Sequence, residues 1–562
     1  MSLSADTTEP ALPRPAPATE HGPLDDRFYD LVESRFRRVM RDNPVAATYF
    51  GIHEYDDELG DGGRETLLAE ITADREHLAA IEGLDPAGLS APVRFERDLE
   101  IHNVRRSIFE GDELRIWERR SLALDTVGDG LFLLFVRDHA PLAERLDAIA
   151  GRLEAVPRHL EEARTRSSEP QVRLWQRIEI ESAGQLPALF DELVAAGGDT
   201  LAPAEQRRLE RAAGAATVAV DLYTTWLEGT LETGTDEWPI GRERHDRMVE
   251  LRAFDGRDAD EILELGYEKL AEERAARSAA AREIAPDADE ADVIARVKAD
   301  HATTFDGALK EYRDAMRRAR GHLIDRGLVT IPDDERIDVV ETPQYLRNVI
   351  PFAAYFSPAA FDTGSKGIYV VTPSVHGDPN AIREHNRASI SNTSIHEAYP
   401  GHHLQLDAAR RHPSLTRLLA DAPEFVEGWG MYSELMMREE GFDDGPQYQL
   451  MLHTDAIWRA CRIILDVRLH RGELTVDEGV DFLIEQTRFE RDNARSEVEW
   501  YTYRPTYPLS YLLGRTLLLE LRADERRRLG DAFSLRDFHD TLLRNGSLPI
   551  SFQRRLLAGE GA

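Results

Sequence analysis

The 562-residue chain contains one cysteine and no long apolar run. Cys461 alone cannot form an internal disulfide, so cysteine usage leaves the redox compartment open. No stretch approaches the roughly 20 apolar residues of a membrane-spanning helix, and no signal peptide is visible. We therefore expect a cytoplasmic protein without a membrane partner.

Positive charge is also scarce. The chain has 69 Lys and Arg residues against 104 Asp and Glu residues, a formal net charge of −35. Nucleic acids and anionic lipids bind through clustered cations, so this balance argues against both as partners. Neutral or cationic peptides are better matched to such a surface than acidic ones. Oligomeric state does not follow from these features.

Three regions follow from the residue pattern. Residues 1–24 are rich in Pro, Ala and Thr, which is typical of a disordered leader. From residue 25 to about 330, apolar residues recur every three or four positions, which predicts a helical scaffold and cleft wall. Residues 331–562 are predicted to form the catalytic region, with a small β-sheet, the metal-binding helix and the C-terminal helices.

Short β-rich segments stand near the start of the third region, at residues 337–343, 353–356 and 367–373, each bounded by Pro, Gly or Ser. They predict a small sheet, and an unpaired edge strand can bind an extended peptide through its backbone. Tyr369 is a candidate substrate-binding residue in the last segment. The predicted fold is mainly α-helical, with this sheet lining a deep cleft.

The most informative stretch runs from Thr393 to Gln405 and contains a Glu and three His residues. The familiar zinc motif places two His residues four positions apart, on one helical face. In an unbroken helix, His403 would return to within about 20° of His396, whereas His402 would face away. Pro400 and Gly401 should bulge the helix, however, so we favour His402 as the second ligand and retain His403 as the alternative.

A third ligand is expected between Glu424 and Glu434, because a pair of helices joined by a loop can bring this segment against the histidines. Glu427 is the preferred candidate, with Glu424 and Glu434 as alternatives. Gly428 and Gly430 each destabilise a helix by about 1 kcal/mol relative to Ala, which close approach of another helix to the metal would explain.

Two His and one Glu are the donor set of a catalytic Zn²⁺ site with a position left for water. Glu397, beside His396, is the candidate general base. Tyr507 and Tyr511 belong to a segment with four tyrosines in eleven residues, 501–511. A phenol donates a hydrogen bond while neutral, which suits oxyanion stabilisation, and we assign Tyr507 to substrate binding.

The strings His396 to Gln405, Glu427-Gly428-Trp429 and Tyr511 to Gly514 resemble the bacterial family called domain of unknown function 885. That family is in turn similar to helical zinc metallopeptidases, the gluzincins of the thimet oligopeptidase and angiotensin-converting enzyme type. The resemblance implies a zincin-like helical fold, a ligand set of two His and one Glu, and Tyr511 as the late tyrosine that holds the oxyanion.

The sequence therefore predicts a zinc-dependent hydrolase that cleaves amide bonds of short peptides. Two alternatives remain. One is a metal-dependent amidohydrolase acting on a non-peptide amide, with the same ligands and a smaller pocket. The other is a catalytically inactive helical binding protein whose site is distorted by Pro400 and Gly401.

Overall fold

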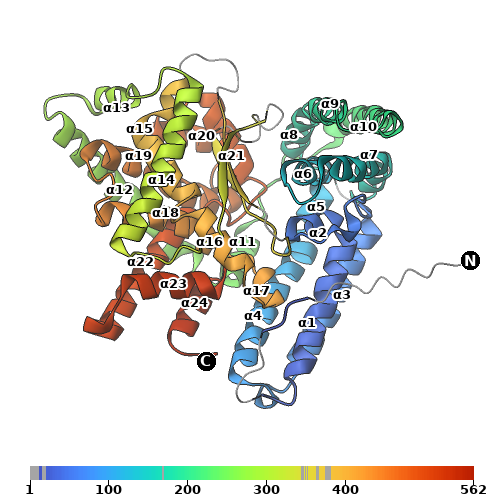
Figure 1. Ribbon diagram of the computed structural model, residues 1–562, viewed down its shortest axis with the longest axis horizontal. Helices are drawn as coiled ribbons and strands as arrows, with labels where there is room; N and C mark the ends of the chain where they lie inside the picture. The colour runs from blue at the N-terminus through green and yellow to red at the C-terminus, as the bar shows by residue number, and fades with distance from the viewer. Residues whose placement is uncertain are drawn as a thin grey trace, which may run out of the picture.

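Helices dominate the computed structural model, which describes residues 12–15, 21–167, 170–343, 347, 350, 352–362, 366–373 and 381–561. The N-terminal half (α1 to α10) lies on one side of the molecule. The C-terminal half (α11 to α24, with the sheet) lies on the other, and the sheet faces the N-terminal half (Figure 1). The predicted combination of many helices with a small sheet is confirmed.

The N-terminal half contains two helical groups with separate cores. Its helices are α1 (Asp25–Asp42), α2 (Pro44–Phe50), α3 (Arg64–Glu82), α4 (Ala91–Ile108), α5 (Ile116–Arg119), α6 (Ala123–Val136), α7 (Leu142–Arg164), α8 (Arg173–Ala183), α9 (Leu186–Gly197) and α10 (Pro203–Thr230), with the short turn η1 (His53–Tyr55) after α2. One core joins α1 to α4, and the other joins α6 to α10.

The C-terminal half surrounds the largest core. Its helices are α11 (Arg242–Arg252), α12 (Ala259–Ile284), α13 (Glu290–Lys298), α14 (Phe305–Arg326), α15 (Arg387–Glu397), α16 (His402–Arg410), α17 (Leu415–Leu418), α18 (Pro423–Glu439), α19 (Pro446–His470), α20 (Val476–Thr487), α21 (Arg491–Tyr501), α22 (Ser510–Leu529), α23 (Leu535–Asn545) and α24 (Ile550–Leu557). The most extensive helix–helix contacts are those of α12 with α19 and of α18 with α22.

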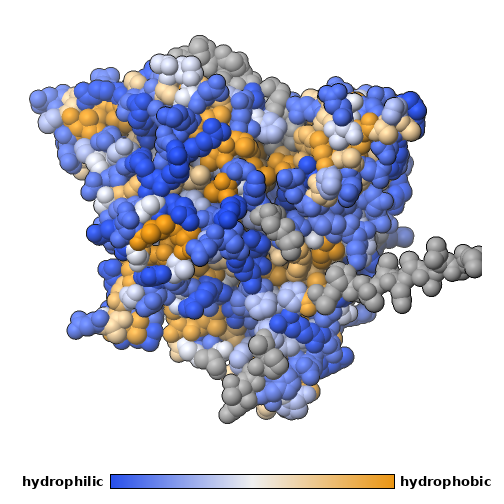
Figure 2. Space-filling view, in the orientation of Figure 1, coloured by the Kyte–Doolittle hydropathy of each residue, from blue (hydrophilic) through white to orange (hydrophobic). Residues whose placement is uncertain are grey.

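Local sequence signals account for several helix starts. Asn43 accepts a hydrogen bond from the backbone of Ala46, and Pro44 occupies the first position of α2. Asp258 and Glu261 form a reciprocal capping box at the start of α12. Hydrophilic residues cover most of the face in Figure 2, as expected of helices that each bury one side, with apolar patches between them.

The described part of the predicted leader, residues 12–15 and 21–24, lies against the N-terminal half. Arg14 pairs with Asp30 and Glu33 of α1, at 2.7 and 2.9 Å. The rest of the leader lies outside the described residues. The main core includes Val172 and Trp175 as well as Val339, so it crosses the boundary predicted near residue 330, and the division there stays a prediction.

The sheet has three strands, β1 (Ile337–Glu341), β2 (Ala353–Phe356) and β3 (Gly367–Val371), in the order β1-β3-β2. β3 is therefore central, parallel to β1 and antiparallel to β2.

Tyr369 on β3 is 0% exposed and packs against Tyr312, with ring centroids 5.8 Å apart. A side chain without exposed surface does not touch a substrate in this conformation, and the substrate-binding role of Tyr369 stays a prediction.

Candidate metal centre

The stretch with three histidines forms two helices rather than one bulged helix. α15 ends at Glu397, α16 begins at His402, and Ala398 to Gly401 form the break between them. A side chain at Gly401 would clash with the carbonyl oxygens of Ile395 and His396, so the turn requires glycine. The helix is therefore completely broken rather than bulged. The directions of His402 and His403 relative to His396 cannot be derived from the geometry of one continuous helix.

The break brings His396 and His402 together, and Glu427 of α18 lies beside both. Glu427 Oε2 is 3.6 Å from His396 Nε2 and 3.4 Å from His402 Nε2. The two imidazole rings are 4.6 Å apart and stand at 89° to each other. The three residues are 7, 9 and 8% exposed. One oxygen and two nitrogens thus converge on a nearly enclosed point.

His403 points the other way, toward the sheet. Its Nε2 lies 2.8 Å from Glu335 Oε2, and its Nδ1 lies 2.9 Å from the hydroxyl of Tyr355 on β2. The side chain is completely buried, and both ring nitrogens are engaged. The structure therefore groups His402, and not the alternative His403, with His396 and Glu427.

Glu434 and Glu424, the alternative acids on α18, have different surroundings. Glu434 Oε1 lies 2.6 Å from His396 Nδ1, while Asn392 donates to its other oxygen at 2.8 Å. An anchored carboxylate at Nδ1 leaves Nε2 of His396 facing Glu427. Glu424 is buried without a hydrogen-bond partner in the described part of the chain, and burial raises its pKa to about 7.

The cluster has an uneven charge distribution. Burial alone would raise the pKa of Glu427, but its contacts with His396 and His402 hold that pKa well below its usual range. Burial lowers the pKa of His396, but Glu427 and Glu434 more than offset this and raise it to about 10. Two carboxylates around one imidazole form an anionic pocket that a cation would neutralise.

The glycines of α18 have the steric role predicted for them. A Cβ at Gly430 would lie 2.6 to 2.8 Å from three ring atoms of His396, so this position must be free of a side chain. A Cβ at Gly428 would lie 2.6 Å from the Cα of Gly514 on α22, which confirms close helix contact. Trp429, between them, donates to the Pro400 carbonyl at 2.8 Å and fixes the α15–α16 turn against α18.

Both predicted tyrosines of the late segment lie near Glu427. The Tyr507 hydroxyl donates to Glu427 Oε1 at 2.9 Å, so Tyr507 positions a candidate ligand instead of presenting a free hydroxyl. Tyr511 is partly exposed, with its ring 6.1 Å from that of Tyr507. The Arg462 guanidinium stands 4.5 Å from the Tyr511 ring centre, a cation–π contact. Burial, reinforced by the Glu427 charge, raises the pKa of Tyr511, so its phenol remains a donor.

Glu397 ends α15 and is partly exposed. No hydrogen bond or ion pair engages its side chain within the described parts of the chain, so the carboxylate is available. Burial raises the pKa of Tyr312 and Tyr369, and the negative charge of Glu397 adds to both shifts. The same charge also helps to raise the pKa of His396, so the Glu397 carboxylate lies within electrostatic reach of the metal-site histidine.

Sequence reasoning missed the role of Glu434 and gave Arg459 and Arg462 of α19 no part. The signal for Glu434 was present, because it follows Glu427 by seven positions, two helical turns on the same face. Arg459 Nε and Nη1 are buried without hydrogen-bond partners among the described residues. No local sequence signal would have placed α19 beside Tyr511.

The protein combines a mostly helical architecture with a buried cluster of two His residues and one Glu. A family model described as "Bacterial protein of unknown function (DUF885)" matches residues 44–557, and the chain belongs to this family. No curated protein matches. The family resemblance expected from the sequence is therefore confirmed at the level of DUF885.

Two solved structures share the fold over nearly their whole length. One, described as a "putative lipoprotein of unknown function" from Shewanella oneidensis, is 21% identical, with a TM-score of 0.77 over 94% of this chain and 99% of that one. The other, a "putative lipoprotein" from Colwellia psychrerythraea, is 17% identical, with a TM-score of 0.82 over 95% of this chain and 98% of that one. At these identities the likeness concerns the fold.

These neighbours correct the predicted location. Both are described as a "putative lipoprotein", which contradicts the cytoplasmic location expected from the sequence. The expectation was wrong because the absence of a long apolar run does not identify the compartment in which a protein works. Within the described ranges, no helix is both long and apolar enough to cross a membrane.

Proposed function

We propose that this protein is a zinc-dependent hydrolase that cleaves amide bonds of short peptides. Zn²⁺ would be held by His396 Nε2, His402 Nε2 and Glu427. Glu397 would act as the general base, and Tyr511 would donate a hydrogen bond to the oxyanion. A zincin-like arrangement accounts for this layout, since a His-Glu pair ends one helix and a carboxylate comes from a following helix.

The observation that carries this proposal is the pair of distances from Glu427 Oε2 to the two imidazoles, 3.6 and 3.4 Å. Good N–H···O hydrogen bonds are shorter, roughly 2.7–3.2 Å. Ligands about 2.1 Å from a tetrahedral zinc ion lie about 3.4 Å from one another. Both Glu427–histidine distances therefore match the spacing of two ligands on one zinc ion, and all three candidate atoms lie within 4.8 Å of one another.

The surrounding groups also fit such a site. Glu434 on His396 Nδ1 repeats the carboxylate–histidine pairing found behind metal-bound imidazoles. Tyr507 secures the oxygen of Glu427 that does not face the histidines. When bound, zinc would supply a Lewis acid and lower the pKa of a water in its open position.

Three side chains of the protein have separate roles in the proposed reaction. Glu397, which has no hydrogen bond or ion pair with the described residues, accepts the proton of the attacking water and passes it to the leaving amine. Tyr511, neutral and partly exposed, faces the growing negative charge on the carbonyl oxygen. Arg462, whose guanidinium lies over the face of the Tyr511 ring, packs against that ring.

An amidohydrolase acting on non-peptide amides would use the same residues, so the substrate must be tested directly. The inactive binding alternative is less consistent with the geometry, because Glu427 points at both histidines rather than away from them. We expect hydrolysis of short peptides and little of N-acyl amino acids. The reverse preference would favour the amidohydrolase.

Glu397→Gln is the matched catalytic control. It removes the proton acceptor and retains the size of the side chain, so kcat should fall about 10²–10⁴-fold. Zinc content should stay unchanged, since Glu397 is not among the grouped ligands. Mass spectrometry of the metal and product analysis with a peptide library measure both quantities. Full activity in Glu397→Gln would contradict the assigned base.

A further inference from the structure

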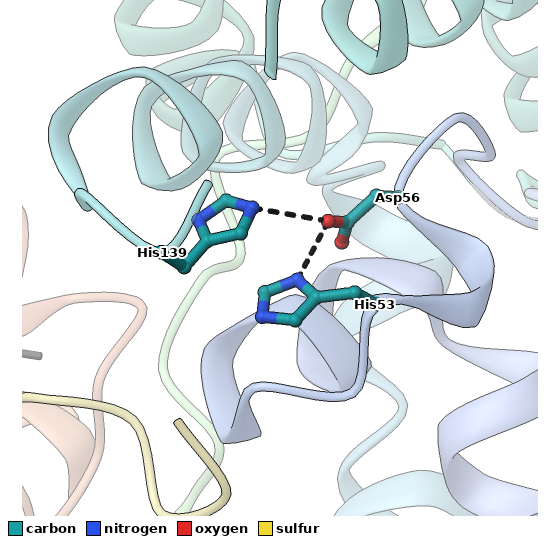
Figure 3. Close-up of side chains that lie close together, drawn as sticks. All are labelled: His53, Asp56 and His139. Atoms are coloured by element: carbon teal, nitrogen blue, oxygen red, sulfur yellow. Dashed lines mark hydrogen bonds and ion pairs between the residues drawn. The ribbon is translucent and has the colours of Figure 1, made fainter. Parts of the chain in front are cut away.

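A second group of His and Asp side chains lies in the N-terminal half, far from the first along the chain. His53 belongs to η1, Asp56 follows it directly, and His139 comes from the segment after α6. Figure 3 shows both imidazoles turned toward the same carboxylate. The group has no part in the proposed reaction.

Its geometry is compact. Asp56 Oδ2 is 2.7 Å from His53 Nδ1 and 3.5 Å from His139 Nε2 (Figure 3). The two rings stack at a centroid distance of 4.0 Å and are only 6° from parallel. All three candidate ligand atoms lie within 4.8 Å of one another. The 3.5 Å contact is longer than a hydrogen bond and close to the ligand spacing of a tetrahedral metal site.

Neighbouring side chains hold His53 and Asp56 in place through hydrogen bonds and an ion pair. Asp362 Oδ1 lies 2.8 Å from His53 Nε2, on the ring nitrogen that faces away from Asp56. Thr48 donates to Asp56 Oδ1 at 2.6 Å, and Arg152 stands 3.8 Å from the same oxygen. A histidine that offers one nitrogen and donates from the other to a carboxylate is the arrangement described above for His396 and Glu434.

Two polar atoms of this group lack partners within the described part of the chain. These are His139 Nδ1 and Asp362 Oδ2, both buried. Their side chains are 8 and 6% exposed, whereas His53 is 34% exposed and gives the cluster an open edge. Asp56 and Asp362 carry the negative charge of the group, and a cation held by Asp56 and the two imidazoles would offset part of it.

We propose that His53 Nδ1, Asp56 Oδ2 and His139 Nε2 form a second divalent-cation site with a structural role. Two imidazoles and one carboxylate favour zinc over magnesium or calcium. An imidazole nitrogen binds a metal in the plane of its ring, so the stacked His53 ring must turn relative to that of His139 when the ion enters, which opens the His53–Asp56 hydrogen bond. Solvent at the exposed edge of His53 completes the coordination.

The site would join the two halves of the protein. Asp362 belongs to the segment after β2, and near it the backbone amide of Phe361 donates to the Phe50 carbonyl at 2.9 Å. Arg137, two residues before His139, donates to the Ser357 carbonyl at 3.1 Å. A metal on His53 therefore holds the ring that anchors Asp362. It would thus stabilise the end of β2 against the N-terminal half.

Zinc titration of the metal-free protein tests this site separately from the proposed catalytic one. The wild-type chain should bind about two Zn²⁺ ions, His396→Ala about one, and His396→Ala with Asp56→Asn none. Asp56→Asn keeps the shape and the acceptor for Thr48, and circular dichroism checks the fold. His139→Gln should lose the same ion. In each variant, zinc should raise Tm only where a site remains.

His21→Ala is the matched control, because His21 is an exposed histidine near two carboxylates, at 3.5 and 3.7 Å, and belongs to no three-residue metal cluster among the described residues. It should retain both ions. If the catalytic centre binds no metal, the wild type binds one ion and Asp56→Asn loses it, so the two proposals fail independently. A His396→Ala protein that binds no zinc, or whose zinc is unaffected by Asp56→Asn and His139→Gln, would overturn the second site. The cluster would then be an ion pair.

Discussion

Glu427 and Glu434 occupy one face of α18 and contact opposite nitrogens of His396. Glu427 approaches Nε2 at 3.6 Å, and Glu434 approaches Nδ1 at 2.6 Å. The longer distance suits a metal between the groups, and the shorter one is a charge-assisted hydrogen bond. The two residues are of the same type, so the imidazole nitrogen that each carboxylate approaches distinguishes the candidate metal ligand from the carboxylate that orients the imidazole.

Glu434→Gln tests this orienting role. The amide retains a hydrogen bond to His396 Nδ1 but loses the negative charge, so zinc affinity should fall about 10–100-fold. Competition with a chromophoric chelator measures that change. Glu439→Gln on the same helix, where the acid pairs with Arg522 at 2.8 Å, is the control and should bind zinc normally. Equal affinity in both variants would show that Glu434 does not tune the site.

The residue scale also shows how far a sequence can specify a site. His396, His402 and Glu427 could be proposed because donor type and local order restrict the choices. The burial of Tyr369 could not be predicted, because it depends on strand order and β3 is the central strand. Tyr507 was assigned to the right neighbourhood, but its contact with Glu427 depends on how α18 meets the segment before α22.

At the element scale, periodicity predicted the helices and the three strand segments well. The break after Glu397 was only partly predictable. Pro400 and Gly401 indicate a disturbance, but its size depends on Trp429 holding the turn from another helix. Local propensity therefore identifies where a helix is interrupted, and tertiary contacts determine which histidine faces the site.

Gly430→Ala tests the packing of α18 against the metal centre. The new Cβ would lie within 2.8 Å of the His396 ring, so the imidazole must shift and zinc binding should weaken at least tenfold. Gly214→Ala on α10 is the control, since a Cβ there meets nothing within 4 Å. That change should stabilise the fold by about 0.5–1 kcal/mol. Calorimetric zinc titration and thermal unfolding separate the two effects, and unchanged zinc affinity in Gly430→Ala would contradict the packing argument.

On the scale of the whole molecule, the two halves share contacts as well as a core. The Trp175 indole of α8 donates to Thr502, after α21, at 2.8 Å. The predicted boundary near residue 330 has no counterpart in this core, because apolar patterns identify helices but not which of them pack together. Long-range packing of this kind could not be predicted from one sequence.

Metal removal should therefore affect the stability of the entire chain. A ligand that binds only the native state at 100 times its Kd stabilises it by about 2.7 kcal/mol. Dialysis against a chelator should lower Tm by several degrees, and added zinc should restore it. Magnesium is the control and should have little effect on a site of His and carboxylate donors. An identical Tm with and without zinc would be inconsistent with both proposed sites.

The central claim, that His402 rather than His403 binds the metal with His396 and Glu427, is tested most directly by zinc content. His402→Gln and His403→Gln are compared after purification without chelator. We predict that His402→Gln loses one zinc ion per chain, whereas His403→Gln, whose amide can still donate to Glu335, retains the wild-type amount. Loss of zinc in His403→Gln with full retention in His402→Gln would contradict the account.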